Sequence, residues 1–507
     1  MAAKAITLSG HGVTVADVVA TARHRAPIAL SPDARARVVA ARAVVDRLTA
    51  SGAAYYGVTT ALGANTGKPI SADELATYQR HAVLARAVGI GARFPTDVVR
   101  AMMFARIAAM AVGGSGVSPT VLDALVAALN AGLHPIVPSK GSIGVADLAP
   151  LSHMTLPLLG LGEAEFEGRV TKGADALARA GLAPVTLAAK DGLALISANA
   201  ATVGHAALVL EDCAHTLDAL NVATALTFEG FRANLSPLDP RVQKSRPARG
   251  QAAIAQRLSA LLSGSALWQP GAARRVQDPI SLRCVSQVHG AALAALLVVR
   301  DDVEIELNSA ADSPVVLTED EAMLSTGNFH IPGLAIDFDA LGLAFAHVAM
   351  ICVERCQKLY APGMSGLPLQ LTRRGPEHSG FATTQKTLTA LHNEIRHLAN
   401  PASLDCLPVS ETVEDHAPMA ANVVAKTGAM VAPLTHLAAI ELLSAAQAID
   451  LRELALETLG EGARSAYTAV RARVPMLDED RPLGPDIETI AAAITRGEIE
   501  TTDLLAR

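Results

Sequence analysis

The sequence predicts an all-α protein, and three observations lead to this expectation. Half of the residues are hydrophobic, whereas aromatic residues make up only 3% of the chain. Alanine and leucine dominate the apolar fraction, and both favour helices over strands. Long stretches repeat apolar residues with helical spacing, and 507 residues are enough to bury a large core. We therefore expect a long-helix bundle with functional loops between its helices.

The helical spacing places the expected helices along most of the chain. They cover residues 33–51, 72–88, 97–112, 119–132, 192–229, 251–263, 282–308, 336–358, 385–398 and 419–459. Ser118 is a candidate N-cap, with Pro119 at the first helical position. Polar, irregular loops are expected at 53–69, 134–151, 265–281, 308–330 and 403–418, and loops of this length in a compact chain are commonly functional.

We expect one helical domain over residues 1–507, because no Pro-, Ser- or Gly-rich linker and no fixed-period repeat interrupts the chain. Its expected parts are an N-terminal part (1–200), a central helical bundle (201–470) and a peripheral C-terminal segment (471–507), which is more charged and contains proline.

Charge and composition exclude several classes of partner. The net charge is −7, with Lys and Arg scattered rather than gathered in a stripe, so nucleic acid is not an expected partner. Apolar stretches such as 341–353 are shorter than a bilayer span, so no membrane is expected. The N-terminus lacks the apolar region of a secretory signal, which indicates the cytoplasm. Five scattered cysteines predict neither a disulfide framework nor a metal site.

One segment carries a specific resemblance. Residues 141–154 read GSIGVADLAPLSHM, which resembles the signature loop of the histidine and aromatic amino acid ammonia-lyases. Other landmarks follow in that family's order across about residues 30–470: YGVTT at 56–60, QDP at 277–279, SLRC at 281–284, ELNS at 306–309, GNFH at 327–330, SGF at 379–381, PAS at 401–403 and EDH at 414–416. The resemblance implies a lyase with a long all-helical fold, a small amino-acid or betaine substrate, and a homotetramer whose active sites combine loops of several subunits.

The signature loop departs from the family pattern at its centre. In the family an Ala-Ser-Gly triad cyclises to methylidene-imidazolone, an electrophile formed when the serine loses water. Here Gly144 is followed by Val145, Ala146 and Asp147, which is one residue shorter and contains no serine. We therefore expect no cofactor. The alternative is that Ala146 stands for a condensed triad, which would leave Val145 as an extra residue.

The resemblance also implies the site residues. Tyr56 corresponds to the catalytic base, Arg283 would clamp the substrate carboxylate with help from Asn308, and Glu414 would bind an imidazole N–H. Arg86 replaces a ring-binding histidine, and Ser197 replaces an asparagine. The full candidate set comprises catalytic Tyr56, Arg86, Glu414 and Lys386, and substrate-binding Arg283, Asn308, Gln277, Glu411, Phe329, Ser197 and His330.

These departures lead to a substrate hypothesis. A quaternary trimethylammonium group leaves as a neutral amine and has no lone pair with which to attack an electrophile. Arg86 would stabilise a ring thiolate, and the new charges Glu411 and Lys386 map near the pocket, where Glu411 would face a cation. The expected reaction is a 1,2-elimination of trimethylamine from a histidine betaine such as ergothioneine, as in the ergothionase branch of the superfamily. The alternatives are a methylidene-imidazolone-dependent histidine or aromatic ammonia-lyase, and an inactive homologue with a structural role.

Overall fold

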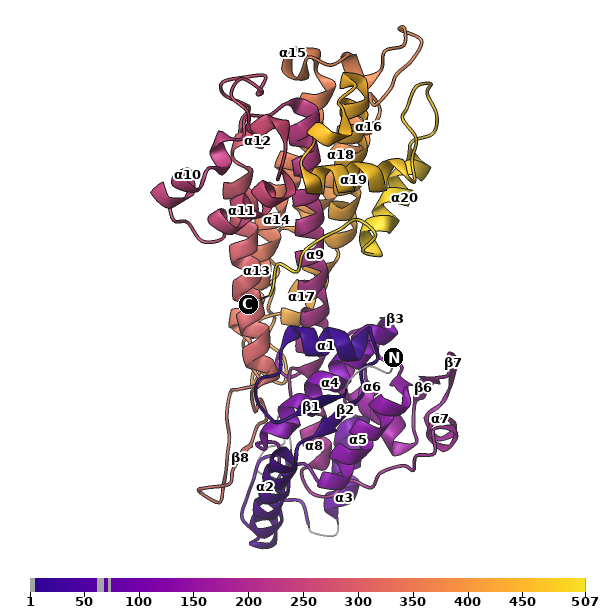
Figure 1. Cartoon of the computed structure of the whole chain (residues 1–507). Coiled ribbons are helices and arrows are strands. Elements are labelled where there is room, and N and C mark those ends of the chain that lie inside the picture. The colour runs from indigo at the N-terminus through magenta and orange to yellow at the C-terminus, as the bar shows by residue number, and fades with distance from the viewer. Residues whose placement is uncertain (1–4, 62–67, 72–73, 507) are drawn as a thin grey trace. The chain divides into compact units, whose positions relative to one another are not determined.

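The computed structural model describes residues 5–61, 68–71 and 74–506, and it confirms an all-α fold. The chain divides into two compact units, each described here by itself (Figure 1). The first comprises Met1–Glu211, Arg300–Ile336 and Pro401–Ala425, and the second Asp212–Val299, Asp337–Asn400 and Lys426–Arg507. The expected parts 1–200, 201–470 and 471–507 do not follow these boundaries, and the expectation of a single domain stays a prediction.

The first unit holds helices and several short strands. Its helices are α1 (Val15–Ala22), α2 (Pro32–Ala50), α3 (Leu75–Leu84), α4 (Thr96–Val112), α5 (Pro119–Ala131), α6 (Leu148–Thr155), α7 (Gly173–Arg179) and α8 (Asp191–Ile196). Its strands are β1 (Ile6–Leu8), β2 (Ile28–Leu30), β3 (Ile90–Arg93), β4 (His134–Pro135), β5 (Pro138–Lys140), β6 (Glu163–Phe166), β7 (Arg169–Lys172), β8 (Val315–Leu317) and β9 (Ala322–Leu324). They form small sheets: β1 pairs with β2 in parallel, and β3–β5, β4–β6–β7 and β8–β9 are antiparallel.

Helix α4 is the centre of the first unit. Residues 98–111 are buried around its whole circumference, and it packs against α1, α2 and α5. A helix buried on every side needs neighbours that cover all of its faces. Gly113 ends α4 in a left-handed conformation with φ 104°, which glycine adopts without steric cost.

The second unit is built around α18 (Val431–Arg452), which packs against α16 (Thr384–Leu398), α19 (Glu461–Arg471) and α20 (Gly484–Thr495). Ile490 and Ile494 of α20 are fully buried, so the C-terminal segment belongs to this core. The remaining helices of this unit are α10 (Pro240–Ser245), α11 (Gln251–Leu261), α12 (Ile280–Arg283) and α15 (Pro362–Ser365). Four helices run across a unit boundary: α9 (Ala200–Phe231), α13 (Val285–Leu307), α14 (Pro332–Tyr360) and α17 (Ala420–Gly428).

Two of the expected long helices are each divided. The stretch 192–229 breaks between α8 and α9, where Ser197 has φ −94° and ψ 74°. The stretch 419–459 breaks between α17 and α18, close to Pro433. Proline has no N–H to donate to the preceding turn, and its ring clashes with the carbonyl four residues earlier, so a helix cannot run through it undisturbed. Pro119 does begin α5, but the Ser118 hydroxyl donates to Asp191 Oδ2 (2.7 Å) instead of capping that helix.

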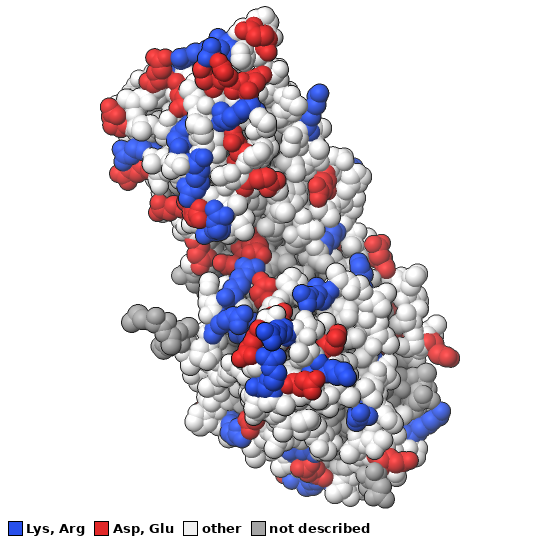
Figure 2. All heavy atoms as spheres, turned by 90° about the vertical axis from the view of Figure 1, so that its right-hand side faces the viewer, with Lys and Arg blue, Asp and Glu red and all other residues white. Residues whose placement is uncertain are grey.

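The expectation that the apolar stretches are all shorter than a bilayer span is corrected by three helical stretches. Residues 191–231, 332–360 and 420–452 are each long and apolar enough to cross a membrane by length and composition alone. Within the protein, 94% and 78% of the apolar windows of the first and third are buried, but only 44% of that of the second. Long apolar helices therefore fit a bundle core here, and α14 exposes an apolar face. On the face shown in Figure 2, Lys and Arg are interspersed with Asp and Glu.

Candidate active site

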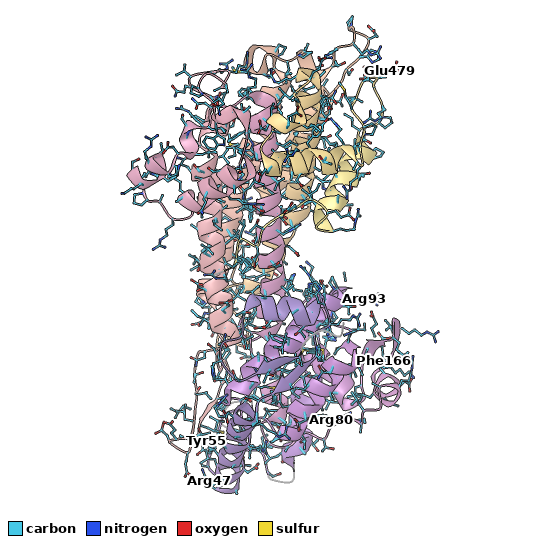
Figure 3. The ribbon with its side chains drawn as sticks, in the orientation of Figure 1. Arg47, Tyr55, Arg80, Arg93, Phe166 and Glu479 are labelled. Atoms are coloured by element: carbon cyan, nitrogen blue, oxygen red, sulfur yellow. The ribbon has the colours of Figure 1, made fainter. Side chains whose placement is uncertain are left out.

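Tyr56 lies on a compact turn that follows α2. The carbonyl of Tyr55 accepts hydrogen bonds from the N–H groups of Val58, Thr59 and Thr60 at 3.0–3.1 Å. Thr59 Oγ1 accepts from Tyr55 N at 2.8 Å and donates to Ala53 O at 2.6 Å. Tyr55, labelled in Figure 3, packs against a buried cluster that includes Val58. The turn is thus anchored, and Tyr56 itself is 36% exposed.

The signature loop is held by the buried carboxylate of Asp147. Oδ1 accepts from Ser142 Oγ at 2.6 Å and from Thr202 Oγ1 at 2.8 Å, and Oδ2 accepts from Thr202 N at 2.7 Å. Burial raises the pKa of Asp147, and these hydrogen bonds oppose that rise. Asp147 N also donates to Ala198 O at 2.7 Å, which uses the carbonyl at the break between α8 and α9. A contact between distant segments therefore ends the helix next to Ser197.

The centre of the loop passes close to α17. Gly144 has φ 77°, and a Cβ there would lie 2.7 Å from Ala420 N. Met419 N donates to Ile143 O at 3.0 Å. A side chain larger than hydrogen is thus excluded at Gly144, and Ala146, with φ 47°, is also left-handed.

The loop brings two further candidates into the site. Val145 pairs with His330 in an antiparallel bridge, and Ala146 N donates to Phe329 O at 3.4 Å. His330 Nε2 lies 2.8 Å from His416 Nδ1, and the rings meet edge to face. Burial, followed by the neighbouring His416, lowers the pKa of His330. Sequence reasoning missed His416 as a partner, although it lies in the EDH landmark.

Glu414 and Glu411 belong to one tight loop before α17. Val409 and Glu414 exchange both backbone hydrogen bonds, at 3.0 and 3.3 Å, and Glu414 Oε1 accepts from Ser410 Oγ at 3.0 Å. Glu411 is exposed and left-handed with φ 56°. Both carboxylates are thus on a surface loop that leads directly to the residues packed on Gly144.

Arg86 and Asn308 contact backbone groups in this structure. Arg86 is half-buried just after α3 and donates to Ala82 O at 3.3 Å. Asn308 Nδ2 donates to Val13 O at 2.8 Å, and its Oδ1 accepts from Val13 N at 2.9 Å. Asn308 thus tethers the N-terminal segment, and its role toward a substrate carboxylate stays a prediction.

Three candidates lie in the second unit. With its carbonyl oxygen turned toward the guanidinium, Gln277 accepts from both Nη atoms of Arg283, at the end of α12. Arg283 Nε has no partner among the described residues. Lys386 lies in the first turn of α16. The structure therefore brings Gln277 and Arg283 together, and the approach of Arg283 and Lys386 to Tyr56 stays a prediction.

The described residues contain no group of three or more side chains suited to a metal.

Comparison with known proteins agrees with the fold. A model of the aromatic amino acid lyase family matches residues 13–472. Histidine ammonia-lyase of Symbiobacterium thermophilum is 42% identical over 497 residues, covering 98% of this chain and 97% of the relative. Histidine ammonia-lyase of Treponema denticola is 40% identical over 500 residues, covering 98% of both.

Solved structures give the same result. Ergothionase from Treponema denticola, crystallised with desmethyl-ergothioneine sulfonic acid, matches with TM-score 0.95 and 32% identity, covering 98% of this chain and all of that one. Histidine ammonia-lyase from Trypanosoma cruzi matches with TM-score 0.89 and 31% identity, covering 98% and 94%. The fold and these relatives define the class of protein, a carbon–nitrogen lyase. The chain belongs to the aromatic amino acid lyase family.

These relatives correct the expectation that the chain uses no cofactor. Relatives at 40–42% identity over almost the whole chain are histidine ammonia-lyases, whose built-in cofactor is methylidene-imidazolone, so the expectation of none is wrong. The loop residues Val145, Ala146 and Asp147 do not fit that group, because none carries the hydroxyl that leaves as water when it forms. The hydroxyl of Ser142, earlier in the loop, is bonded to Asp147.

Proposed function

We propose that this lyase eliminates an amine from a histidine-like substrate, and that its substrate is the betaine ergothioneine, with trimethylamine as the leaving group. The observation that carries the proposal is the set of charged residues, Arg86, Lys386 and Glu411, at positions where the family pattern has other residues. The 32% identity to ergothionase over nearly the full length of both chains supports the same substrate class.

In the proposed reaction Tyr56 acts as a phenolate, takes up the β-proton of the substrate and becomes a neutral phenol. The electron pair of the C–H bond forms the new carbon–carbon double bond, the C–N bond breaks, and trimethylamine leaves with the electrons of that bond as a neutral molecule. Arg283 binds the substrate carboxylate, and Glu414 accepts a hydrogen bond from the imidazole N–H. Arg86 faces the ring thiolate. Glu411 faces the departing cationic group.

A second candidate function has a specific observation in its favour. The relatives at 40–42% identity are histidine ammonia-lyases, so histidine with ammonia as leaving group is the competing substrate. An inactive homologue is the third alternative, and the retention of Tyr56, Arg283 and Glu414 argues against it.

The decisive experiment offers the purified protein ergothioneine, histidine and tyrosine in parallel. Trimethylamine is followed by proton NMR, ammonia by a coupled assay, and the conjugated acid by ultraviolet absorbance. Trimethylamine from ergothioneine alone supports the proposal, whereas ammonia from histidine alone identifies a histidine ammonia-lyase. Absence of every product identifies the inactive homologue.

The Tyr56→Phe variant should lose at least about 100-fold in kcat while still binding the substrate.

We also propose that the protein assembles with copies of itself, as a homotetramer. Helix α14 exposes Ile336, Leu343 and Met350, which are 59%, 48% and 54% accessible. Positions seven residues apart lie on the same face of a helix, so these side chains form one apolar stripe. A second copy of the chain would remove this stripe from water.

A further inference from the structure

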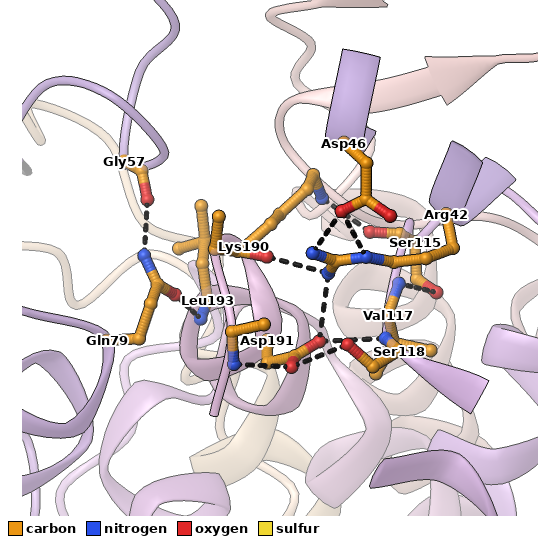
Figure 4. A network of polar contacts seen from close by, with 12 residues as sticks. Arg42, Asp46, Gly57, Gln79, Ser115, Val117, Ser118, Lys190, Asp191 and Leu193 are labelled. Carbon is orange, nitrogen blue, oxygen red and sulfur yellow. Dashed lines mark hydrogen bonds and ion pairs between the residues drawn. The ribbon is translucent and has the colours of Figure 1, made fainter. Parts of the chain in front are cut away.

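Gln79 of α3 connects two segments of the first unit. It is fully buried; its Nε2 donates to Gly57 O at 3.1 Å, and its Oε1 accepts from Leu193 N at 3.1 Å (Figure 4). Gly57 follows Tyr56 directly, and Leu193 lies in the first turn of α8. The side-chain amide of Gln79 therefore supplies a hydrogen-bond partner to a carbonyl of the turn that carries Tyr56. It also supplies one to a backbone N–H at the start of α8, which has no partner within the helix.

The α8 end of this connection is firmly held. Asp191, its first residue, accepts from Ser118 N and Ser118 Oγ, both at 2.7 Å, and pairs with Arg42 at 3.3 Å. A Cβ at Gly192 would lie 2.4 Å from Gln79 O, so α3 and α8 meet backbone to backbone. Gln79 thus holds the Tyr56 turn against a fixed support.

The other end of α8 touches the signature loop. Its C-terminal neighbour Ala198 accepts from Asp147 N at 2.7 Å. The chain of contacts therefore runs from the Tyr56 turn through Gln79 and α8 to Asp147. Replacing Gln79 removes the contact with the Tyr56 turn but leaves the hydrogen bonds of Asp147 in place, because none of them involves Gln79.

We propose that Gln79 is a positioning residue that sets the Tyr56 turn relative to the signature loop. The inference rests on the proposed function, in which Tyr56 removes the β-proton. Gly57 has φ 67°, and glycine moves between conformations readily, so the hydrogen bond to its carbonyl fixes the turn. Without this bond the phenol moves relative to the substrate, and a displacement of about 1 Å can cost about 100-fold in rate.

The test compares Gln79→Leu with a matched control, Gln447→Leu. Gln447 is also a buried glutamine, which donates to Leu371 O (3.1 Å) and Leu477 O (2.7 Å) and accepts from Leu477 N (3.0 Å). Both variants should lower the melting temperature. Only Gln79→Leu should lower kcat, by about 30- to 100-fold with KM within about threefold, at a temperature where both variants are folded.

Gln79→Glu separates positioning from structural support. Its carboxylate still accepts from Leu193 N, but it donates to Gly57 O only when protonated. The ratio of variant kcat to wild-type kcat should therefore rise as the pH falls from 8 to 5. If Gln79→Leu does not fold, the pH dependence of Gln79→Glu tests the proposal in its place. A ratio that is independent of pH overturns the inference.

Hydrogen exchange gives a readout that does not depend on turnover. The backbone amides of residues 57–61 should exchange faster in Gln79→Leu, and at the wild-type rate in Gln447→Leu. If Tyr56→Phe keeps full activity, the proposed base is wrong while faster exchange still supports the link from Gln79 to the turn. If Tyr56→Phe is inactive but Gln79→Leu matches Gln447→Leu in kcat and exchange, the inference is overturned.

Discussion

Asp147 accepts two hydrogen bonds from Thr202, one from its backbone N–H at 2.7 Å and one from its hydroxyl at 2.8 Å. Thr202 lies in the first turn of α9, where backbone N–H groups lack partners within the helix. Asp147 therefore caps a helix that begins more than fifty residues later in the chain. The cap fixes the end of the signature loop to the longest helix of the fold.

Asp147→Asn should destabilise the protein by about 3 kcal/mol, because the new NH2 group faces donors in place of an acceptor. Urea unfolding measures the loss. Asp123→Asn is the control, since Asp123 pairs with Arg35 at the surface and its loss should cost less than about 1 kcal/mol. Equal losses in the two variants would contradict the capping role.

His134 should make stability fall in acid. Burial, followed by Arg100 and Arg25, lowers the pKa of His134 to about 4 from 6.5. Its Nε2 lies 3.1 Å from Arg100 Nη1, a donor, so the neutral ring accepts there. Nδ1 is 3.9 Å from Glu165 Oε1, too far for a hydrogen bond that would favour the charged ring.

The sign follows from proton binding: the unfolded state gains a proton near pH 6.5, and the folded state only near pH 4. The stabilisation is complete above pH 6.5 and is lost as the pH falls toward 4, to a total on the order of 3 kcal/mol. His134→Gln should flatten this part of the curve in urea titrations at several pH values. An unchanged slope in the variant would show that other groups cause the loss.

Arg355 and Glu441 form a fully buried ion pair in the second unit, at 2.6 Å. Glu441 Oε1 also accepts from Thr227 Oγ1 at 2.9 Å. Arg355→Met leaves a buried charge without its partner and should cost about 3–5 kcal/mol. The double variant Arg355→Met with Glu441→Leu should recover most of that loss. A double variant as unstable as the sum of the two single variants would refute this account.

The apolar stripe on α14 should control the oligomeric state. Leu343→Glu combined with Met350→Glu places two charges on the stripe, which should shift the mass from a tetramer to smaller species in light scattering. Val39→Glu is the control, since Val39 is a 50% exposed residue of α2 outside the stripe. A mass that stays unchanged in both variants would exclude α14 from the interface.

The sequence predicted what depends on local periodicity and on family motifs. Pro119 marked the start of α5. The structure places Phe329 and His330 of the 327–330 motif beside the signature loop, while their role toward a substrate stays a prediction. The break at Ser197 was missed because it depends on Asp147, which is far away in the chain. The sequence did not single out Gln79, because no helical pattern distinguishes a buried amide with two backbone partners from an ordinary polar residue.

The close approach of Gly144 to Ala420 has a consequence for how such proteins are recognised. A residue that is glycine because the neighbouring backbone leaves no room is retained for as long as the two segments cross, whatever bond the protein breaks. A search pattern anchored on this glycine therefore reports the crossing of the two segments and not the bond that the protein breaks. The presence of this glycine therefore carries no information about which substrate the protein uses.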